Sequence, residues 1–514
     1  MKIRQYVLMS FVLFSFSSVH STELMLNKSW QSIQADAQNA VVQIFVVSRN
    51  FNWFNPYVMH GPKQSCGTGF FINKDGEIAT CSHVIEDALS VFIGIPCLGK
   101  KLLKADVVGL CPSRDIAILR LDDESFECVK KELGEIHCLE LGDSHTVQRG
   151  EEIICLGYPA TTIEIEQLKG TVGVISSRLN RVFQYDAPSN PGNSGGPVLN
   201  KKGIVIGITS SGMLGNVQNA NFATPINIFK ALLPNLYENT LLRINNLGII
   251  WSPTTKDIRA YLGNPNVEGC IVCDLEKSEK VSSLGIQVGD IIYEVDGYAI
   301  DSYGDIKALC DGERIRFDEY IGQLPLGSEV FFKVYRNGES LNICAIIDNQ
   351  GESSIPLCYP SYEEIEYEIF GGMIVMPLTI NYIEASAKER PGLQRYLTNL
   401  YNQGPRLVIA NIIADSKMAH MRTMSWADTI NEINGEKVCT LDDFRRALKK
   451  SISTGVVVIK TTREATLETD NVLNVLSLYD SCKETVQLSY THQYPLSKTV
   501  MEIIKAIDSS LLKR

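Results

Sequence analysis

The chain contains one short run whose residue types and spacing suit nucleophilic chemistry. Residues 190–197 read NPGNSGGP and place Ser194 between glycines. Glycines allow backbone conformations in which consecutive N–H groups point at one spot, where the negative oxygen of an acyl-transfer intermediate could be bound. By itself the run could also be an ordinary surface turn. It becomes a candidate nucleophile loop only if a base and an acid lie elsewhere in the chain.

The candidate base is His83. It follows two alternating segments, 67–72 and 78–82, which predict two strands joined by a turn at 74–76, with the second strand ending at the histidine. An imidazole can take a serine proton near neutral pH and return it later to a leaving group. None of the other histidines among the seven has a comparable setting, although His83 alone could equally be a structural residue.

The candidate acid is Asp115, which stands at the start of the apolar strand 116–121. A carboxylate in that position fixes the tautomer of the histidine and stabilises its protonated form. Alone, Asp115 could be a turn acid at a strand end. The chain order His83, Asp115, Ser194 is that of chymotrypsin and differs from the orders of subtilisin and the α/β-hydrolases. Taken together, the three residues predict a catalytic triad.

Five sequence blocks carry a family resemblance. They read CGTGF, TCSHV, DIAIL, GNSGGP and NFATP, at residues 66–70, 80–84, 115–119, 192–197 and 221–225. In these blocks the chain resembles the HtrA/Deg family of serine proteases. Residues 312–321 and 332–338 further resemble the first PDZ domain of plant Deg proteases and their bacterial relatives. The departures are mild: Cys81 and Ser82 replace the usual Asn-Ala, and Thr224 replaces an apolar residue.

The resemblance implies a mainly β fold, in which a chymotrypsin-like double β-barrel protease domain is followed by two PDZ-like α+β domains. It implies acyl transfer with Ser194 as nucleophile, His83 as base and then acid, and Asp115 orienting the histidine. The oxyanion hole would be formed by the loop at Gly192, Asn193 and Ser194. No cofactor and no metal are expected.

The residues around the expected specificity pocket carry no charge. The positions where a trypsin-like pocket would need an acid hold Pro188 and Ser189. We expect the opposite wall to be formed by Ile208, Thr209 and Ser210. Because an uncharged pocket does not compensate the loss of solvation of a charge, this predicts cleavage after small or aliphatic residues.

The length and composition limit the classes of protein to which the chain could belong. A length of 514 residues predicts about three domains. A hydrophobic fraction of 45% with 21% charged residues of both signs excludes a disordered chain. A net charge of −11 does not suggest the basic surface that nucleic-acid binding needs. The fourteen cysteines are scattered singly, so most are expected to be buried thiols and no disulfide is assigned. Cys270 and Cys273 should face opposite sides of one strand.

The N-terminal residues predict a signal peptide. Lys2 and Arg4 precede an apolar run at 6–16, and small residues follow, which suits cleavage before Thr22. The alternative is an uncleaved anchor helix, but the run is short for a bilayer span. The sequence therefore predicts export, and together with the family resemblance it favours the bacterial periplasm.

The second half of the chain contains an internal repeat. Residues 283–297 resemble the glycine-aspartate turn and strand of a PDZ domain, and a related run recurs at 427–435. In the first module the family's carboxylate-binding loop would lie at Tyr261, Leu262 and Gly263, which could also be a plain hydrophobic turn. The second module begins near 369–375 and is followed by a helical stretch at 383–401, so its groove could be blocked and its role could be assembly.

The expected organisation is a signal peptide at 1–21, a protease domain at 28–236, PDZ-like domains at 243–348 and 360–472, and a C-terminal extension at 473–514. The resemblance implies that partners are unfolded or damaged polypeptides, peptide C-termini and further copies of the chain in a trimer-based homo-oligomer. Two other roles stay open. One is a chaperone or scaffold in which hydrolysis is secondary, and the other is a dedicated regulatory protease.

Overall fold

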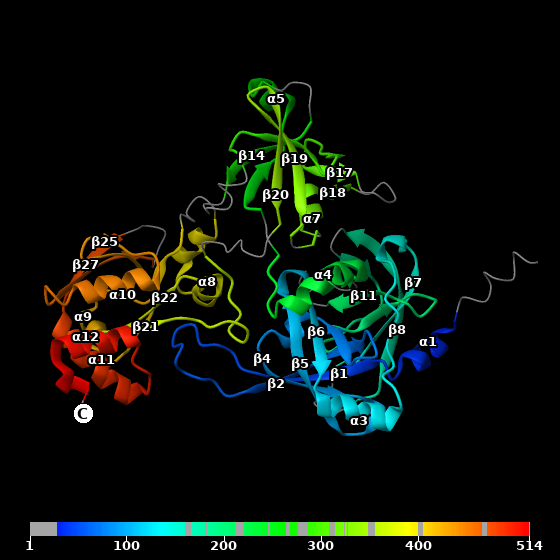
Figure 1. Ribbon diagram of the computed structural model, residues 1–514, viewed down its shortest axis with the longest axis horizontal. Coiled ribbons are helices and arrows are strands. Elements are labelled where there is room, and N and C mark those ends of the chain that lie inside the picture. Colours follow the sequence, from blue (N-terminus) through cyan, green and yellow to red (C-terminus); the bar gives the residue numbers. More distant parts are fainter. Residues whose placement is uncertain are drawn as a thin grey trace, which may run out of the picture. The chain divides into compact units, whose positions relative to one another are not determined.

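The computed structural model is mainly β (Figure 1). It describes residues 28–159, 166–179, 182–210, 220–244, 247–263, 268–275, 285–307, 314–322, 324–325, 327–347, 355–398, 404–464 and 470–512. The predicted signal peptide lies outside the described residues. No helix in these ranges is long and apolar enough to cross a membrane.

Two closed six-stranded barrels form the first half of the chain, as the resemblance implied. The first barrel has the strand order β1-β2-β3-β6-β5-β4 and the second has the order β10-β11-β12-β9-β8-β7. The strands of the first barrel are β1 (Val41–Ser48), β2 (Lys63–Phe71), β3 (Glu77–Thr80), β4 (Ala88–Gly94), β5 (Leu102–Cys111) and β6 (Ile116–Leu121). Those of the second are β7 (Glu152–Gly157), β8 (Lys169–Leu179), β9 (Val182–Tyr185), β10 (Pro197–Leu199), β11 (Val205–Ser210) and β12 (Asn221–Pro225).

Apolar residues explain why these strands close on themselves. β1 reads VVQIFVVS and β11 reads VIGITS, and their apolar side chains are buried. The helices and short 3-10 turns of this part are α1 (Trp30–Ala37), α2 (Ser82–Ile85), η1 (Pro96–Leu98), η2 (Pro112–Arg114), α3 (Asp123–Leu133), η3 (Ser144–Thr146) and α4 (Ile226–Glu238). α4 follows β12 directly and buries Phe229 and Leu236 in the core of the first half of the chain.

The chain divides into two compact units by its internal contacts. The first unit contains both barrels together with residues 307–328, and the second contains residues 49–62, 245–306 and 329–514. Residues 307–328 carry β18, α7 and the last residue of β17, the strand that pairs with β18. Their bounds are β17 (Asp305–Lys307), β18 (Arg314–Arg316) and α7 (Phe317–Ile321).

The second unit contains two antiparallel sheets. One has the order β13-β14-β15-β19-β20, with β16 paired to β15. Its elements are β13 (Ile249–Ser252), α5 (Lys256–Tyr261), β14 (Cys270–Leu275), β15 (Ile291–Val295), β16 (Tyr298–Ala299), β19 (Glu329–Arg336) and β20 (Glu339–Ile346). β13 therefore lies at an edge of its sheet.

The other sheet has the order β21-β22-β23-β24-β26-β27, with β25 paired to β24. Its strands are β21 (Glu368–Phe370), β22 (Met373–Pro377), β23 (Leu407–Ile412), β24 (Thr429–Ile433), β25 (Glu436–Lys437), β26 (Val456–Arg463) and β27 (Asp470–Ser477). Its helices are α8 (Ile380–Ser386), η4 (Pro391–Leu397), α9 (Lys417–Met421), α10 (Leu441–Lys450), α11 (Leu478–His492), α12 (Lys498–Asp508) and η5 (Ser509–Leu512). α8 and η4 occupy the stretch that the sequence predicts to be helical.

The last helices pack onto this second sheet. Cys482 on α11 and Ile503 on α12 share one hydrophobic core with Phe370, Met373 and Phe444. The backbone N–H of Gly371, in the turn between β21 and β22, donates to Thr485 Oγ1 of α11 at 2.8 Å. Residues 478–512 are thus a helical layer of the last module, a stretch that was predicted only as a C-terminal extension.

An aromatic loop from between β1 and β2 also belongs to the second unit. Phe54 packs on Tyr382 and Trp426, with ring centroids 5.5 and 5.6 Å apart, and Tyr57 packs on Tyr494 at 5.4 Å. The Asn411 side chain donates to the Asn55 side chain at 3.0 Å (sequence separation 356 residues). We call residues 49–62 the aromatic loop.

The cysteines differ in part from expectation. None of the thirteen described cysteines is assigned to a disulfide, and Cys81, Cys111, Cys155, Cys270 and Cys482 alone among them are buried. The expectation that most would be buried is therefore wrong, because several lie on solvent-facing positions of strands and loops. Cys270 is buried and Cys273 is exposed, which confirms that they face opposite sides of β14.

Candidate active site

The glycine-rich run forms a tight loop between β9 and β10. Gly192 and Gly195 have φ values of +98° and +87°, a region that disfavours other residues. The N–H of Asn193 donates to the Asn190 carbonyl at 3.0 Å, and the N–H of Gly196 donates to the Asn193 carbonyl at 3.0 Å. Ser194 stands at the centre of this loop and is 6% exposed.

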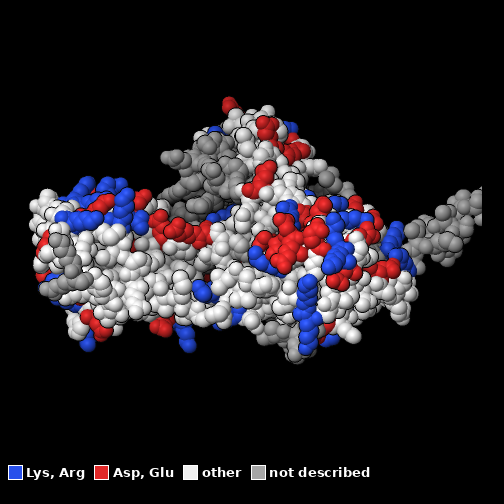
Figure 2. All heavy atoms as spheres, turned by 60° about the horizontal axis from the view of Figure 1, so that its bottom comes forward, with Lys and Arg blue, Asp and Glu red and all other residues white. Residues whose placement is uncertain are grey.

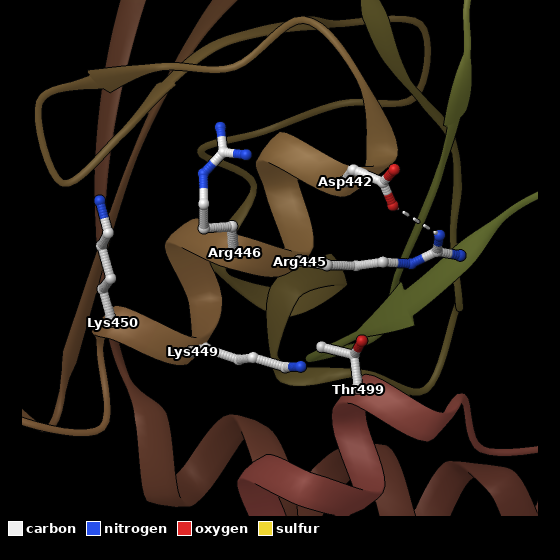
Figure 3. A pocket seen from close by; sticks show the side chains of 6 residues that line it. All are labelled: Asp442, Arg445, Arg446, Lys449, Lys450 and Thr499. Carbon is white, nitrogen blue, oxygen red and sulfur yellow. Dashed lines mark hydrogen bonds and ion pairs between the residues drawn. The ribbon is translucent and has the colours of Figure 1, made fainter.

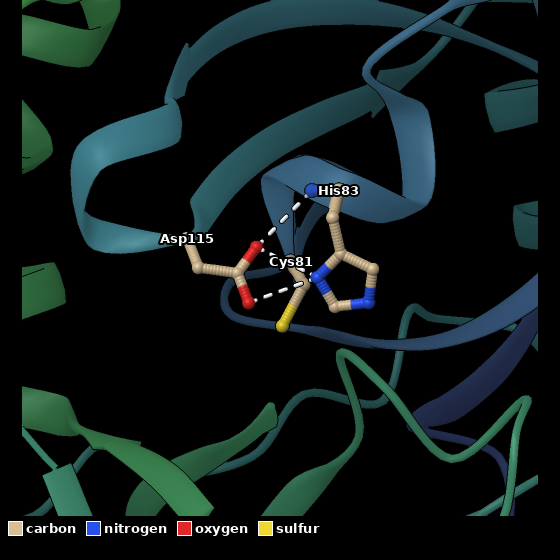
Figure 4. A group of neighbouring side chains, drawn as sticks. All are labelled: Cys81, His83 and Asp115. Atoms are coloured by element: carbon tan, nitrogen blue, oxygen red, sulfur yellow. Dashed lines mark hydrogen bonds and ion pairs between the residues drawn. The ribbon is translucent and has the colours of Figure 1, made fainter. Parts of the chain in front are cut away.

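His83 and Asp115 are joined by hydrogen bonds (Figure 4). His83 Nδ1 lies 2.8 Å from Asp115 Oδ1 and 2.9 Å from Oδ2, and the His83 backbone N–H donates to Oδ1 at 3.1 Å. The histidine side chain is 40% exposed, whereas the aspartate side chain is 10% exposed. A buried acid therefore holds one ring nitrogen while the other part of the ring stays accessible.

Local structure places these two residues differently from the sequence prediction. β3 ends at Thr80, and His83 lies in the single helical turn α2, so the prediction of a strand running to the histidine is wrong. Asp115 follows η2 and has a left-handed backbone with φ +53°, immediately before β6. The turn of α2 brings the His83 backbone N–H onto the carboxylate, which a continuing strand would not do.

Two serine hydroxyls complete the surroundings of Asp115. Ser82 Oγ donates to Oδ1 at 3.2 Å, and Ser210 Oγ donates to Oδ2. With both oxygens accepting hydrogen bonds, the carboxylate cannot rotate away from His83 without losing several of them. Neither serine was predicted to hydrogen-bond to Asp115.

The charges of the pair reinforce each other. Burial alone would raise the pKa of Asp115, but hydrogen bonding and charge from His83, with Ser210, hold it below its usual value. Burial alone would lower the pKa of His83, but the hydrogen bond and charge of Asp115, with a smaller contribution from Glu86, raise it. Near neutral pH the arrangement thus favours an ionised aspartate beside a histidine that accepts a proton readily.

The nucleophile loop and the segment before His83 meet at one backbone carbonyl. The carbonyl of Thr209 on β11 accepts the Gly195 N–H at 2.8 Å and the Cys81 thiol at 3.2 Å. Gly195 directly follows Ser194, and Cys81 lies two residues before His83. The loop that carries Ser194 and the segment that leads into His83 therefore both bond to β11 at Thr209.

Cys81, His83 and Asp115 also form a group with metal-ligand chemistry, their donor atoms lying within 4.8 Å of one another (Figure 4). These atoms are engaged otherwise, because His83 Nδ1 bonds to Asp115 and the thiol donates to Thr209. Burial, with the nearby charge of Asp115, raises the pKa of the Cys81 thiol well above its usual value. A protonated thiol is a poor metal ligand, so we assign the group to proton transfer.

The predicted pocket residues have other neighbours. Ile208 lies in the hydrophobic core of the first unit, and Ser210 donates to Asp115, so neither side chain is an open pocket wall. Thr209 is fully buried. Residues 211–219, which follow β11, lie outside the described residues.

The predicted carboxylate-binding loop closes onto a neighbouring turn. Tyr261 ends α5 and is 90% exposed, while Gly263 has φ +80° and lies against the turn at Gly338. Among the described residues, β13, which follows Gly248 with its φ of +65°, is one of the two edge strands of this sheet, the other being β20.

One further cavity, of about 490 Å³, lies between α10 and the start of α12 (Figure 3). Its lining residues are Asp442, Arg445, Arg446, Lys449, Lys450 and Thr499. Every cation in it is ion-paired: Arg445 with Glu368, Arg446 with Asp443, Lys449 with Glu502 and Lys450 with Glu436. Basic and acidic side chains are likewise interspersed on the face shown in Figure 2. We assign no ligand to this cavity.

Known proteins share these features. Residues 67–208 match the model of the trypsin-like peptidase domain. A probable periplasmic serine endoprotease DegP-like from Halomonas elongata is 29% identical over 298 residues, which cover 57% of this chain and 58% of that protein. Its counterpart from Hahella chejuensis is 26% identical over 319 residues, covering 59% and 62%. The chain thus matches about three-fifths of the length of these relatives.

Solved structures resemble the chain as well. A solved HtrA-type protease, AlgW with tripeptide, aligns over 62% of this chain and 97% of its own chain, at 21% identity and a TM-score of 0.47. A serine endoprotease from Yersinia pestis covers 63% at 21% identity and a TM-score of 0.45. The family model and the curated relatives support the resemblance drawn from the sequence: residues 67–208 match a trypsin-like peptidase domain, and the chain is similar to DegP-like serine endoproteases.

Proposed function

We propose that this protein is an exported serine endopeptidase of HtrA/Deg type. The observation that carries the proposal is the His83–Asp115 pair, held at 2.8 Å beside a glycine-rich loop that presents Ser194. A buried, doubly hydrogen-bonded acid on a histidine is the arrangement that activates a serine hydroxyl for attack on a carbonyl.

The reaction follows the acyl-enzyme route. Ser194 Oγ attacks the carbonyl carbon of the scissile peptide bond as its proton passes to His83. The protonated imidazole, stabilised by Asp115, then gives that proton to the departing amine. A water molecule, deprotonated by His83, releases the second product and restores Ser194.

The loop N–H groups bind the negative oxygen formed in both steps. We assign this role to the N–H groups of Gly192 and Ser194, because the N–H of Asn193 donates to Asn190. Asn193 is then a residue that holds the loop. Losing one oxyanion donor typically costs on the order of 100- to 1000-fold in kcat.

Substrate choice follows from the uncharged surroundings. Ser189 occupies the place of a pocket acid, and Thr209 is the uncharged residue of β11 nearest the loop. We propose cleavage after small or aliphatic residues, since no charge is present there to compensate a buried lysine or arginine. Profiling the new C-termini of a digested unfolded protein tests this, and cleavage mainly after basic residues would contradict it.

The relatives' names, periplasmic serine endoproteases, support a periplasmic place for this chain, in line with its predicted signal peptide at 1–21. We propose misfolded or damaged exported proteins as its substrates and a trimer-based homo-oligomer as its assembly. The two modules after the protease domain, expected at 243–348 and 360–472, are proposed to be PDZ-like.

Peptide C-termini are proposed to bind the first of these modules. An added peptide strand needs a free sheet edge, and β13 is such an edge. In the second module the edge strand β21 packs against α11, whose Cys482 shares a core with Phe370 and whose Thr485 takes the N–H of Gly371. We therefore place peptide capture at β13 and a structural role in the second module.

The test is cleavage of an unfolded protein such as reduced casein by the full chain, beside the Ser194→Ala variant. We expect hydrolysis in the unsubstituted protein and a loss on the order of a millionfold in kcat without the nucleophile. No Ser194-dependent cleavage by a folded protein would overturn the proposal. A Ser194→Ala protein that still prevents client aggregation would show a holding role beside the hydrolytic one.

A further inference from the structure

Thr68, on β2, contacts the nucleophile loop through both its backbone N–H and its side-chain hydroxyl. Its N–H donates to the Ser194 carbonyl at 2.9 Å, and its Oγ1 donates to the Gly192 carbonyl at 2.7 Å. The same Oγ1 accepts the Tyr158 N–H at 2.9 Å, and its own carbonyl accepts Thr80 Oγ1 at 2.8 Å. The side chain is fully buried. A single residue thus connects the loop with two neighbouring strands.

The contacts orient the peptide planes of the loop. In a planar trans peptide, the C=O and the following N–H point in opposite directions. Because the Gly192 carbonyl points at Thr68, the next N–H, of Asn193, points away and donates to Asn190. Because the Ser194 carbonyl also points at Thr68, the next N–H, of Gly195, points away and donates to Thr209.

The packing around Thr68 leaves the loop little freedom. A Cβ added to Gly195 would lie 2.1 Å from the Thr68 carbonyl oxygen, and one added to Gly196 would lie 3.2 Å from its methyl group. A Cβ on Gly157 would lie 3.1 Å from its hydroxyl. Glycines therefore surround the threonine, and its hydroxyl is the polar side-chain group that reaches Gly192.

We propose that Thr68 is a positioning residue for the oxyanion hole. Its hydroxyl holds the Gly192 carbonyl, which sets the direction of the adjoining peptide planes and so aims the N–H groups of Gly192 and Ser194 at the negative oxygen. Thr68 touches no reacting atom. This inference rests on the proposed serine endopeptidase function and deepens it by naming what keeps the loop in its working shape.

The test compares two buried hydroxyls. Thr68→Val keeps the shape of the side chain and removes the hydroxyl, and Thr68→Ser keeps the hydroxyl and removes the methyl group. Thr80→Val is the matched control: Thr80 is also fully buried and its hydroxyl bonds to Thr68, but this bond goes to the strand and not to Gly192. All variants are made in the full chain, and melting temperature is measured beside kcat and KM on a peptide substrate.

We expect Thr68→Val to lower kcat by about 10- to 100-fold with KM changed less than about threefold, because misplaced oxyanion donors weaken the transition state more than the ground state. Thr68→Ser should recover kcat to within about threefold of the unsubstituted protein. Binding of a peptide boronate, which forms a tetrahedral adduct, should weaken in parallel with kcat, whereas peptide affinity in the Ser194→Ala background should not change.

Three outcomes would overturn the inference. They are equal losses of kcat in Thr68→Val and Thr80→Val, a loss confined to KM, and a Thr68→Ser protein as slow as Thr68→Val. If Thr68→Val does not fold, Thr68→Ala with Thr80→Ala as control takes its place. Failure of the proposed function is a different result, since the unsubstituted protein would then show no Ser194-dependent turnover.

Discussion

The Arg114 guanidinium donates a hydrogen bond to the Gly322 carbonyl at 2.5 Å. Arg114 is 6% exposed and directly precedes Asp115, and Gly322 ends α7, so a segment from the second half of the chain contacts the turn that carries the proposed catalytic acid. Both residues belong to the first unit. The position of α7 and the backbone of Asp115 are therefore connected through one side chain.

Substituting Arg114 tests this connection. We expect Arg114→Ala to lower the free energy of unfolding by about 1.5–3 kcal/mol, as for loss of a charged hydrogen-bond donor to a buried carbonyl, and to reduce kcat as well. Urea titration and peptide hydrolysis measure the two effects. Lys74→Ala is the control, because Lys74 pairs with Glu135 on the surface. A loss of stability with unchanged kcat would mean that the contact does not reach Asp115.

The His83–Asp115 pair predicts a pH dependence. Burial alone would lower the pKa of His83, but the hydrogen bond and charge of Asp115, together with Glu86, raise it above 6.5, and only the neutral ring acts as a base. The activity should therefore rise with pH through a midpoint above 6.5. In Ser194→Ala, NMR titration of His83 should give a pKa above 6.5 that falls in the additional presence of Asp115→Asn.

The raised pKa of His83 also predicts how the stability of the protein changes with pH. Because the pKa of His83 is raised on folding, the protonated pair stabilises the native state below pH 6.5, and this contribution is lost as the pH rises through the folded pKa. A His83 midpoint below 6.5 would contradict both expectations.

Alanine substitutions at Gly195 and Gly134 distinguish the destabilisation caused by a steric clash from that caused by backbone strain alone. Both have positive φ, +87° and +81°, but a Cβ on Gly195 would lie 2.1 Å from the Thr68 carbonyl, whereas one on Gly134 meets no atom within 4 Å. We expect Gly134→Ala to cost about 1–2 kcal/mol of stability, the strain of a left-handed alanine. Gly195→Ala should reduce stability by clearly more than Gly134→Ala does, and it should also abolish activity. Equal melting temperatures for the two variants would disprove the close contact.

The aspartates in the two copies of the internal repeat have different surroundings, and the one in the second copy predicts a pH dependence of stability. Asp290 forms a bidentate ion pair with Arg336, at 2.7 and 2.8 Å. At the equivalent position burial raises the pKa of Asp428 to about 6, partly offset by the Ser425 N–H and by Arg463. The native state then binds a proton more tightly than the unfolded chain, so Asp428 makes stability fall as the pH rises from about 4 to about 6.

Asp428→Asn should remove this slope and leave the protein at least as stable at pH 7. Urea titrations of the variant and the unsubstituted protein between pH 4 and 7 measure it. An unchanged slope in the variant would assign the pH dependence to another group.

The motif blocks alone predicted much of the site. His83, Asp115 and Ser194 were identified because their neighbours in the chain have distinctive types and order. The two serines on Asp115 were not, because Ser210 reaches the acid across 95 residues of chain. Thr68 lies inside the quoted block 66–70, but its hydroxyl bonds to a carbonyl 124 residues away, a contact that no local pattern encodes.

Local patterns also failed where distant packing decides the structure. Alternation of apolar residues predicted a strand up to His83, yet the chain turns into α2 because the His83 backbone bonds to Asp115. The helical layer at 478–512 is ordered by the core it shares with Phe370 and Phe444, which its own sequence does not reveal.

The aromatic loop has a consequence for the order of folding. Residues 49–62 are synthesised early, but Tyr382, Trp426 and Tyr494, which cover Phe54 and Tyr57, come more than 300 residues later. At a synthesis rate of roughly 5–20 residues per second, four aromatic side chains of this loop stay without their cover for tens of seconds after the first barrel can form. A shortened chain ending after the barrels would never cover these side chains, and its aromatic loop would stay exposed.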